Sequence, residues 1–186
     1  MMRAAPRLLA IVLSLAGVFG QVSACGYDGL YSNPLQAAYP GSLSLAVASR
    51  SAVERGLIPV LPPQSGSSGL FRSQAWLHAL RGRLEAEGLN GSVALLLVDS
   101  GLWARFRAQP SAAPAGGSVQ LEPHIAGPDE SDVVVITTEA ALSALLAGRI
   151  DITAARAAGV IRYQGAESIP ALDKALTSKR KAAAAT

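Results

Sequence analysis

The stretch that decides the fold is Asp132-Val133-Val134-Val135-Ile136-Thr137, in which four β-branched apolar residues follow an aspartate and precede a threonine. The stretch has the length of a strand. A strand that is apolar on both faces is expected to be covered on both faces. After it the sequence predicts a helix over 138–147, capped by Thr138, and a shorter helix over 151–158. A short strand over 160–163 follows. This part of the chain therefore predicts a strand, two helices and a second strand.

Toward the N-terminus the sequence predicts three more strands. Residues 92–98 form a second continuous apolar run, which ends at an Asp-Ser-Gly turn signal. The strand over 102–108 alternates, so that Arg105 and Arg107 share one face. The strand over 119–125 contains a proline, which predicts an irregular or edge position. These segments predict a hairpin extended by a third strand.

Helices are expected before and after these strands in the sequence. One begins at Ser73 and ends at Gly88, with an apolar stripe on one side and Arg81 and Arg83 facing water. Another opens at Ser168, with a proline just inside it. The element order predicts an α+β fold, in which a mostly antiparallel five-stranded sheet is covered by helices on one face.

The segment before this domain is expected to be an N-terminal helical and irregular preface. Residues 26–40 contain several glycine and proline breakers. A helix is predicted over 42–55, with its apolar residues at positions 43, 46, 47 and 53. The prolines make 57–63 extended, and 64–69 is rich in Ser and Gly, as flexible linkers are.

The order of these elements resembles the sterol-carrier-protein-2 (SCP2-like) lipid-binding family. The resemblance rests on the strand over 132–137, the helix over 142–146, the Gly-basic-aliphatic-Asp turn Gly148-Arg149-Ile150-Asp151, and the segment from 154 to Gly165. It covers about residues 71 to 178. The chain departs from the family in its leader, in its front segment over 25–69 and in its alanine-rich helices.

The resemblance implies a non-catalytic protein that holds a lipid, a fatty acyl chain or an isoprenoid between sheet and helices. Burial of an apolar ligand would supply the binding energy. The alternative is that the same apolar side chains fill a packed core. The candidate ligand-contacting residues are Trp76, Leu80, Val93, Leu95, Leu97, Val133, Val135, Leu142, Leu145 and Leu146.

The first 24 residues have the pattern of a signal peptide, with a basic start, an apolar run of about 12 residues and a small-residue end. The run is short of the ~20 residues that span a bilayer. We therefore expect an extracytoplasmic protein. Val22-Ser23-Ala24-Cys25 resembles the bacterial lipoprotein box, in which the cysteine is acylated and joins the protein to a membrane. The alternative is ordinary cleavage that leaves Cys25 free or in a mixed disulfide. The glycine after Cys25 resembles the pattern directed to an outer membrane.

The expected organisation is a signal peptide over 1–24, an arm and linker over 25–70, the SCP2-like domain over 71–178 and a basic, alanine-rich tail over 179–186. The formal net charge is +3. Much of it lies in the leader and the tail, so no clustered footprint for nucleic acid is expected. The hydrophobic fraction of 50% excludes a disordered chain.

No nucleophile with a neighbouring base and no phosphate-binding glycine loop is evident, so we expect no enzyme and no cofactor. One cysteine and two histidines do not make a metal site. Asp129, Glu130 and Asp132 are expected to lie in a solvated loop. A second functional hypothesis is an accessory or scaffold lipoprotein that binds a partner protein through residues 26–63 and has a filled core.

Overall fold

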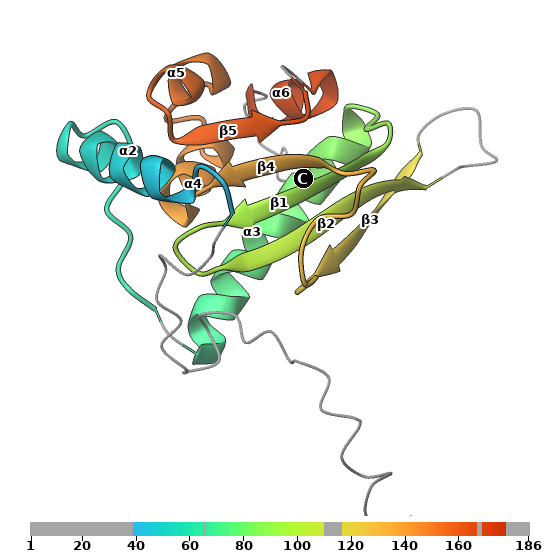
Figure 1. The fold of residues 1–186 in the computed structure, drawn as a ribbon, viewed down its shortest axis with the longest axis horizontal. Coiled ribbons are helices and arrows are strands. Elements are labelled where there is room, and N and C mark those ends of the chain that lie inside the picture. Colours follow the sequence, from blue (N-terminus) through green and yellow to red (C-terminus); the bar gives the residue numbers. More distant parts are fainter. Residues whose placement is uncertain (1–38, 65, 110–116, 167–168, 178–186) are drawn as a thin grey trace, which may run out of the picture.

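The centre of the protein is one five-stranded sheet, with the strand order β3-β2-β1-β4-β5 (Figure 1). The structure is a computed structural model that describes residues 39–64, 66–109, 117–166 and 169–177. The predicted strands are confirmed. Their bounds are Ser92–Leu97 for β1, Leu102–Gln109 for β2, Ser118–Pro123 for β3, Val133–Thr137 for β4 and Ile161–Gln164 for β5.

The sheet is mostly antiparallel, as expected. β1 pairs with β2, β2 with β3 and β4 with β5 in antiparallel fashion, whereas β1 and β4 are parallel. Val93 lies opposite Val133 in the parallel pair. The two apolar runs that the sequence shows are therefore the two central parallel strands, and both are buried on both faces.

Four helices cover one face of the sheet: α3 (Gly66–Ala86), α4 (Glu139–Leu146), α5 (Ile152–Ala157) and α6 (Pro170–Thr177). The predicted caps of α4 and α5 are present, because the Thr138 side chain accepts from the backbone N–H of Ala141 and Asp151 accepts from that of Ala154. The predicted cap Ser73 is wrong, because Ser73 lies inside α3. In Figure 1, α3 runs behind the sheet. Alternate residues of the strands, such as Leu95 and Val135, share one apolar cluster with the helices.

The helix α2 (Ser42–Glu54) lies against the other face. Its Leu45 packs with Leu96, Val134 and Ile136, which are the strand residues that point away from the four helices. The predicted extent of this helix is confirmed, but its predicted apolar face is wrong. The buried residues are Ser42, Leu45, Ser49 and Ala52, whereas Leu43 and Val47 are each 63% exposed.

Small side chains explain which face of α2 turns inward. A Cβ atom on Gly159 would approach the Cβ of Ala48 to 3.3 Å. The hydroxyl of Thr138 also donates to that of the buried Ser49 at 3.3 Å. The helix therefore lies close to the strand ends with its small residues inward, and hydrophobicity along the sequence alone gave the wrong face.

The helix α3 begins earlier than the sequence predicts. Residues 66–69, expected in a Ser/Gly linker, belong to its first turns. Gly69 is buried and Leu70 packs against the apolar cluster. Tertiary packing here outweighs the weak helix propensity of glycine and serine, which is a frequent outcome for a helix that covers a core.

Candidate functional site

A cleft of about 580 Å³ lies between α3 and α4 on the helix-covered side of the sheet. Its walls are mainly apolar or small. A cleft of this size lies within the usual range of about 300–1,000 Å³ for small-molecule sites. Its lining residues are Ala75, Trp76, Ala79 and Arg83 from α3, and Ser143, Leu146, Ala147 and Gly148 from α4 and its C-terminal end.

Short side chains keep the cleft open. Ala75 and Ala79 are one helical turn apart and so lie on the same side of α3. Across from them, α4 ends at Leu146, and Gly148 has a φ of 66°, which glycine adopts without strain. Larger side chains at these positions would fill the hollow.

A charged contact joins α3 and α4 one helical turn before the cleft wall. The guanidinium of Arg72 on α3 donates to the Glu139 carboxylate of α4 at 2.8 Å. The Ser73 hydroxyl donates to the other carboxylate oxygen at 3.1 Å. Arg72 also lies 5.4 Å from the ring centroid of Trp76, a residue of the cleft wall. This contact therefore joins the first turn of α4 to α3 beside the cleft.

Arg83, a residue of the cleft wall, joins α3 to the ends of two other helices. Its guanidinium donates to the backbone carbonyl of Leu146 at 2.6 Å and to that of Ala175 at 3.1 Å. These carbonyls lie in the last turns of α4 and α6, where a cation is favourable. The prediction that Arg83 faces water is therefore wrong, because its guanidinium ties three helices together.

Glu139 is the most unusual ionisable group at the site. The residue is 4% exposed, and burial raises the pKa of its carboxyl from 4.5 to about 7. The nearby Arg72 guanidinium favours the ionised form and so opposes this rise in pKa. The backbone N–H of Glu139 donates to the Asp99 carboxylate at 3.0 Å.

All ten residues that the sequence selects for ligand contact belong to one apolar cluster. Trp76 and Leu146 line the cleft, and Val133 is partly buried. The other seven are at most 3% exposed, so in this structure they contact protein atoms and not an open hollow. They are Leu80, Val93, Leu95, Leu97, Val135, Leu142 and Leu145. Their contact with a ligand stays a prediction.

Sequence reasoning missed the polar residues that join α3 and α4 beside the cleft. Arg72 and Glu139 are 67 positions apart, so no local pattern links them. One available signal was the absence of any acidic residue from 55 to 84, which leaves Arg72 without a carboxylate partner nearby in the sequence. Its partner had to come from a distant element.

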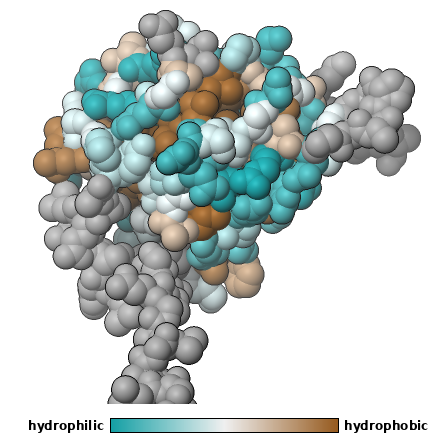
Figure 2. Space-filling model, turned by 45° about the vertical axis from the view of Figure 1, so that its right-hand side comes forward, coloured by the Kyte–Doolittle hydropathy of each residue, from teal (hydrophilic) through white to brown (hydrophobic). Residues whose placement is uncertain are grey.

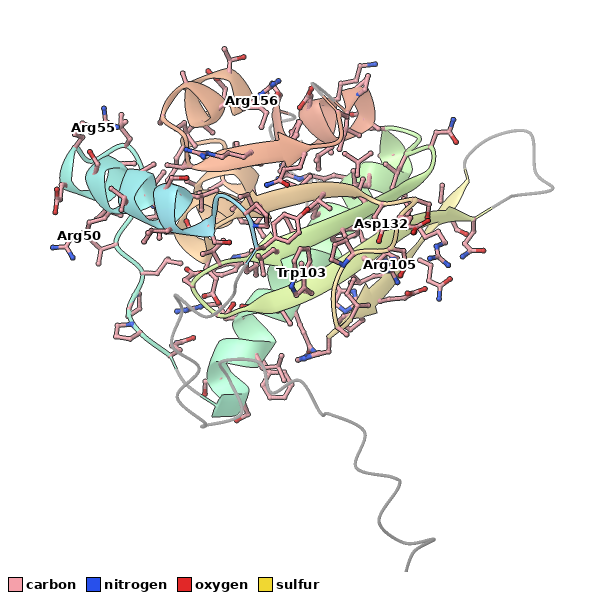
Figure 3. The ribbon with its side chains drawn as sticks, in the orientation of Figure 1. Arg50, Arg55, Trp103, Arg105, Asp132 and Arg156 are labelled. Atoms are coloured by element: carbon pink, nitrogen blue, oxygen red, sulfur yellow. The ribbon has the colours of Figure 1, made fainter. Side chains whose placement is uncertain are left out.

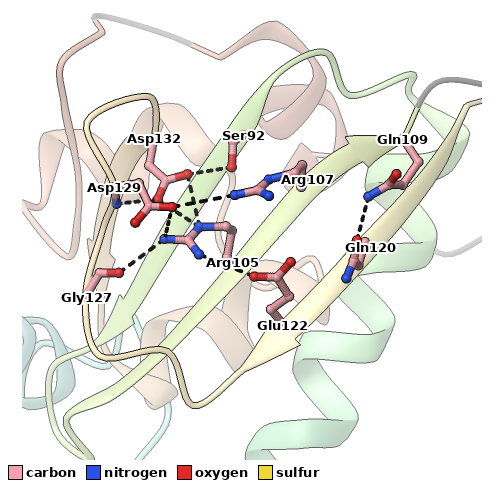
Figure 4. A network of polar contacts seen from close by, with 9 residues as sticks. All are labelled: Ser92, Arg105, Arg107, Gln109, Gln120, Glu122, Gly127, Asp129 and Asp132. Atoms are coloured by element: carbon pink, nitrogen blue, oxygen red, sulfur yellow. Dashed lines mark hydrogen bonds and ion pairs between the residues drawn. The ribbon is translucent and has the colours of Figure 1, made fainter.

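The other face of the sheet carries a second polar cluster, around Arg105 (Figure 4). The Arg105 side chain is 8% exposed and forms ion pairs with Asp132 at 2.9 Å, Asp129 at 2.9 Å and Glu122 at 3.3 Å. Figure 3 shows Arg105 and Asp132 side by side, on the sheet, whereas Arg50 and Arg55 lie at the far end of α2. The prediction of a solvated acidic loop is wrong for Asp132, whose side chain is fully buried.

Hydrogen bonds decide the charge of Asp132. Burial alone would raise the pKa of its carboxyl. The hydrogen bonds from Ser92, from the backbone N–H of Asp129 and from Arg105 outweigh burial and hold that pKa below its usual value. This cluster fastens the loop before β4 to β1 and β2, and it has no contact with the residues of the cleft wall among those described.

Other kinds of site have no candidate among the described residues. No group of three or more His, Cys, Asp or Glu side chains is placed to hold a metal ion. Within the same residues, no helix has the length and apolar character needed to cross a membrane. In the space-filling view, apolar patches interrupt a largely hydrophilic surface (Figure 2).

Comparison of the sequence with protein-family models gave no match, and neither did comparison with curated proteins. Solved structures that are similar to this chain include the following two. A conserved hypothetical protein from Thermus thermophilus, suggested to be a sterol carrier protein, has 18% identity and a TM-score of 0.36, over 56% of this chain and 85% of its own. The crystal structure of sterol carrier protein 2 has 19% identity and a TM-score of 0.36, over 58% and 95%.

Proposed function

We propose that this protein is a non-catalytic, extracytoplasmic binding protein for a hydrophobic small molecule such as a lipid, a fatty acyl chain or an isoprenoid. The observation that carries the proposal is the cleft between α3 and α4, with Trp76 and Leu146 in its walls. The family that the sequence resembles implies the same class of ligand.

Burial of apolar surface is the expected source of affinity. Covering about 200 Å² of a ligand would contribute roughly 5 kcal/mol, at about 25 cal/mol per Å². Part of this free energy offsets the loss of translational and rotational freedom on binding. The polar atoms of Arg83 and Ser143 in the wall favour a ligand that has an apolar body and one polar end.

Filling the cleft tests the proposal. The probe is the uncharged apolar dye N-phenyl-1-naphthylamine, whose fluorescence rises on transfer out of water. Ala79→Trp should occupy the cleft and lower the affinity for the dye at least about tenfold, which corresponds to ~1.4 kcal/mol. Ala86→Trp is the matched control, because Ala86 is exposed at the end of the same helix and does not line the cleft.

Mass spectrometry of an organic extract of the purified protein provides the second measurement. A specific lipid should be found with the wild-type protein and with Ala86→Trp, and should be depleted from Ala79→Trp. Equal dye affinity and equal lipid content in all three proteins would sink the proposal.

Attachment to a membrane through acylated Cys25 belongs to the same proposal. Cys25 lies outside the described residues, so its support is the sequence pattern alone. Several acyl chains hold a protein on a membrane more firmly than one chain does. Cys25→Ser should move the protein from the membrane fraction to the soluble fraction, and unchanged fractionation would contradict acylation.

A second candidate function is that of a scaffold that binds a partner protein through residues 26–63. Exposed apolar side chains in the described part of this segment favour it. Leu43 and Val47 are each 63% exposed and Val60 is 77% exposed. A ligand-free protein that co-purifies with a stoichiometric partner, and loses it on Leu43→Ser with Val47→Ser, would favour the scaffold over the binding protein.

A further inference from the structure

The exposed apolar side chains gather in one part of the protein. Of the five large apolar side chains that are exposed in the described structure, four lie between residues 43 and 60, and the fifth is Phe71 of α3. Leu43 and Val47 are each 63% exposed and lie one helical turn apart on α2. They lie on the outer side of the helix, because Leu45 on its inner side packs against the sheet. Such a concentration marks a candidate contact surface.

Arginines surround this apolar pair. The Arg50 side chain is 80% exposed, and Arg55 is exposed just beyond the end of α2 (Figure 3). Near the other end of α2, Arg162 of β5 donates to the Ser44 hydroxyl at 2.8 Å. Glu54, the one acidic residue of α2, pairs with Arg50 at 2.8 Å. Three positive side chains and one negative side chain make this surface basic, which favours contact with an anionic lipid surface.

The chain that precedes α2 leads to the proposed lipid anchor. Fourteen positions separate Cys25 from Tyr39, the first described residue, and α2 begins three residues later. A fully extended chain spans at most about 3.6 Å per residue, so this segment reaches at most about 50 Å. An acylated Cys25 would therefore keep α2 near the bilayer. A tether of this kind raises the effective concentration of a second, weaker contact.

We propose that the outer side of α2 is a membrane-docking surface, which places Leu43 and Val47 in the headgroup region of the bilayer that holds Cys25. This inference rests on the proposed attachment through Cys25 and adds the orientation of the protein on the membrane. Apolar side chains flanked by arginines are typical of helices that lie in the plane of an anionic bilayer surface. The acylated cysteine and the helix then act as two linked contacts, which hold the protein more firmly than either alone.

A lipid surface fits the outer side of α2 better than a protein does. α2 contains no aromatic residue, whereas the anchors of protein interfaces are mostly Trp and Tyr, together with Arg, in well-packed pockets. A lipid surface requires no complementary shape. The described cleft lies between α3 and α4, on the opposite face of the sheet, so it provides no groove beside α2.

The position of α2 also sets the position of the cleft relative to the membrane. α2 lies against one face of the sheet, and α3 and α4 cover the other (Figure 1). With α2 on the bilayer, the sheet lies between the bilayer and the cleft. A ligand would therefore be exchanged on the aqueous side of the protein and not with the lipids beneath α2.

Quenching by brominated lipids measures which side chains enter the bilayer. The mature protein that begins at Cys25 is coupled through that thiol, the one cysteine of the chain, to maleimide lipids in vesicles. The vesicles contain phosphatidylcholine and phosphatidylglycerol, with or without bromine on their acyl chains. The reporter is Leu43→Trp, in a background of Trp76→Phe and Trp103→Phe that removes both natural tryptophans. Bromine should lower its emission by about half or more, because a helix at the interface buries its apolar face ~5–10 Å deep.

Matched variants make the assignment specific. Phe71→Trp in the same background is the control, because Phe71 is 68% exposed on α3, and its emission should be the same in both kinds of vesicle. Val47→Asp should reduce quenching of the Leu43→Trp reporter, whereas Ser68→Asp, which adds the same charge to an exposed position of α3, should not. Omission of phosphatidylglycerol, or added salt, should reduce quenching by weakening the attraction of the arginines. Circular dichroism establishes that each variant is folded.

The outcomes separate the docking surface from the other proposals. Equal emission of the Leu43→Trp reporter in both kinds of vesicle, or equal quenching of Leu43→Trp and Phe71→Trp, would overturn the docking surface. An unquenched reporter together with loss of a stoichiometric protein partner on Leu43→Ser with Val47→Ser would overturn it in favour of the scaffold. Quenching without dye binding would sustain the docking surface and contradict the binding function. Dye binding with an unquenched reporter would overturn the docking surface and leave the binding function standing.

Discussion

Each face of the sheet holds a buried carboxyl, and the pKa values of these two carboxyls are shifted in opposite directions. Asp132, on the face near α2, accepts hydrogen bonds from Ser92, Arg105 and a backbone N–H, and its pKa is lowered. Glu139, on the face with four helices, has Arg72 and Ser73 as partners, and burial raises its pKa to about 7. Burial alone therefore does not set the charge of a carboxyl; the number and kind of its partners do.

The two carboxyls also contribute to stability in different pH ranges. Stability from Asp132 is present above its unfolded pKa of 3.8 and is lost as the pH falls through the lower folded value. Stability from Glu139 is fully present below its unfolded pKa of 4.5 and is lost as the pH rises toward about 7.

Removal of the cation beside Asp132 should have the largest effect. Arg105→Met leaves a fully buried carboxylate without its ion pair and should lower the free energy of unfolding by about 3–5 kcal/mol. Adding Asp132→Asn should recover much of this loss, because the uncompensated charge is gone. Urea unfolding at neutral pH measures both. A loss in the single variant below about 1 kcal/mol would remove the contrast between the two faces.

Removal of the charge at the other carboxyl should have an effect that depends on pH. In wild type, ionisation of Glu139 should lower the free energy of unfolding by up to about 3 kcal/mol as the pH rises from 4.5 to about 7. Glu139→Gln should lack this part of the pH dependence. The measurement is urea unfolding at several pH values, and parallel curves for the two proteins would contradict the raised pKa.

Enlargement of a core side chain tests whether the helix-covered face is filled. Leu145 is fully buried, so Leu145→Trp should destabilise the protein by about 1–3 kcal/mol through overpacking. Thermal and urea unfolding measure the loss. A variant of wild-type stability would indicate a hollow beside Leu145 that accommodates the larger ring.

The smallest effect is expected at the rim of the Arg105 cluster. The Arg107 side chain is 42% exposed and lies 3.6 Å from the Asp129 carboxylate. Exposed ion pairs contribute little, so Arg107→Met should change the free energy of unfolding by less than about 1 kcal/mol. A loss of stability as large as that of Arg105→Met would mean that solvent exposure does not determine how much each arginine contributes to stability.

Local patterns in the sequence were sufficient for most of the elements. The apolar runs of β1 and β4, the alternation in β2 and the caps Thr138 and Asp151 all lie within a few neighbouring residues. The buried face of α2 could not be read in this way. It is set by small residues that fit close to Gly159, and this fit depends on an element more than a hundred positions away.

The candidate site was predicted in part. The sequence predicted ten apolar residues that would contact a ligand, and the structure places all ten in one apolar cluster. Two of them, Trp76 and Leu146, line the cleft. It gave no indication that alanines and a glycine would form the hollow, because small side chains carry no distinctive signal of their own. Nor did it show that Arg72 and Glu139 form an ion pair between α3 and α4 beside the cleft.

The sequence by itself determined the strands, the helices, the α+β class and the apolar character of the interior, because hydrophobic periodicity and caps act over short distances along the chain. The tertiary structure alone decided which face of α2 is buried, where a cleft stays open, and that Asp132 is held charged while burial favours the neutral form of Glu139. Those outcomes depend on contacts between residues far apart in sequence, and on the desolvation that such contacts produce.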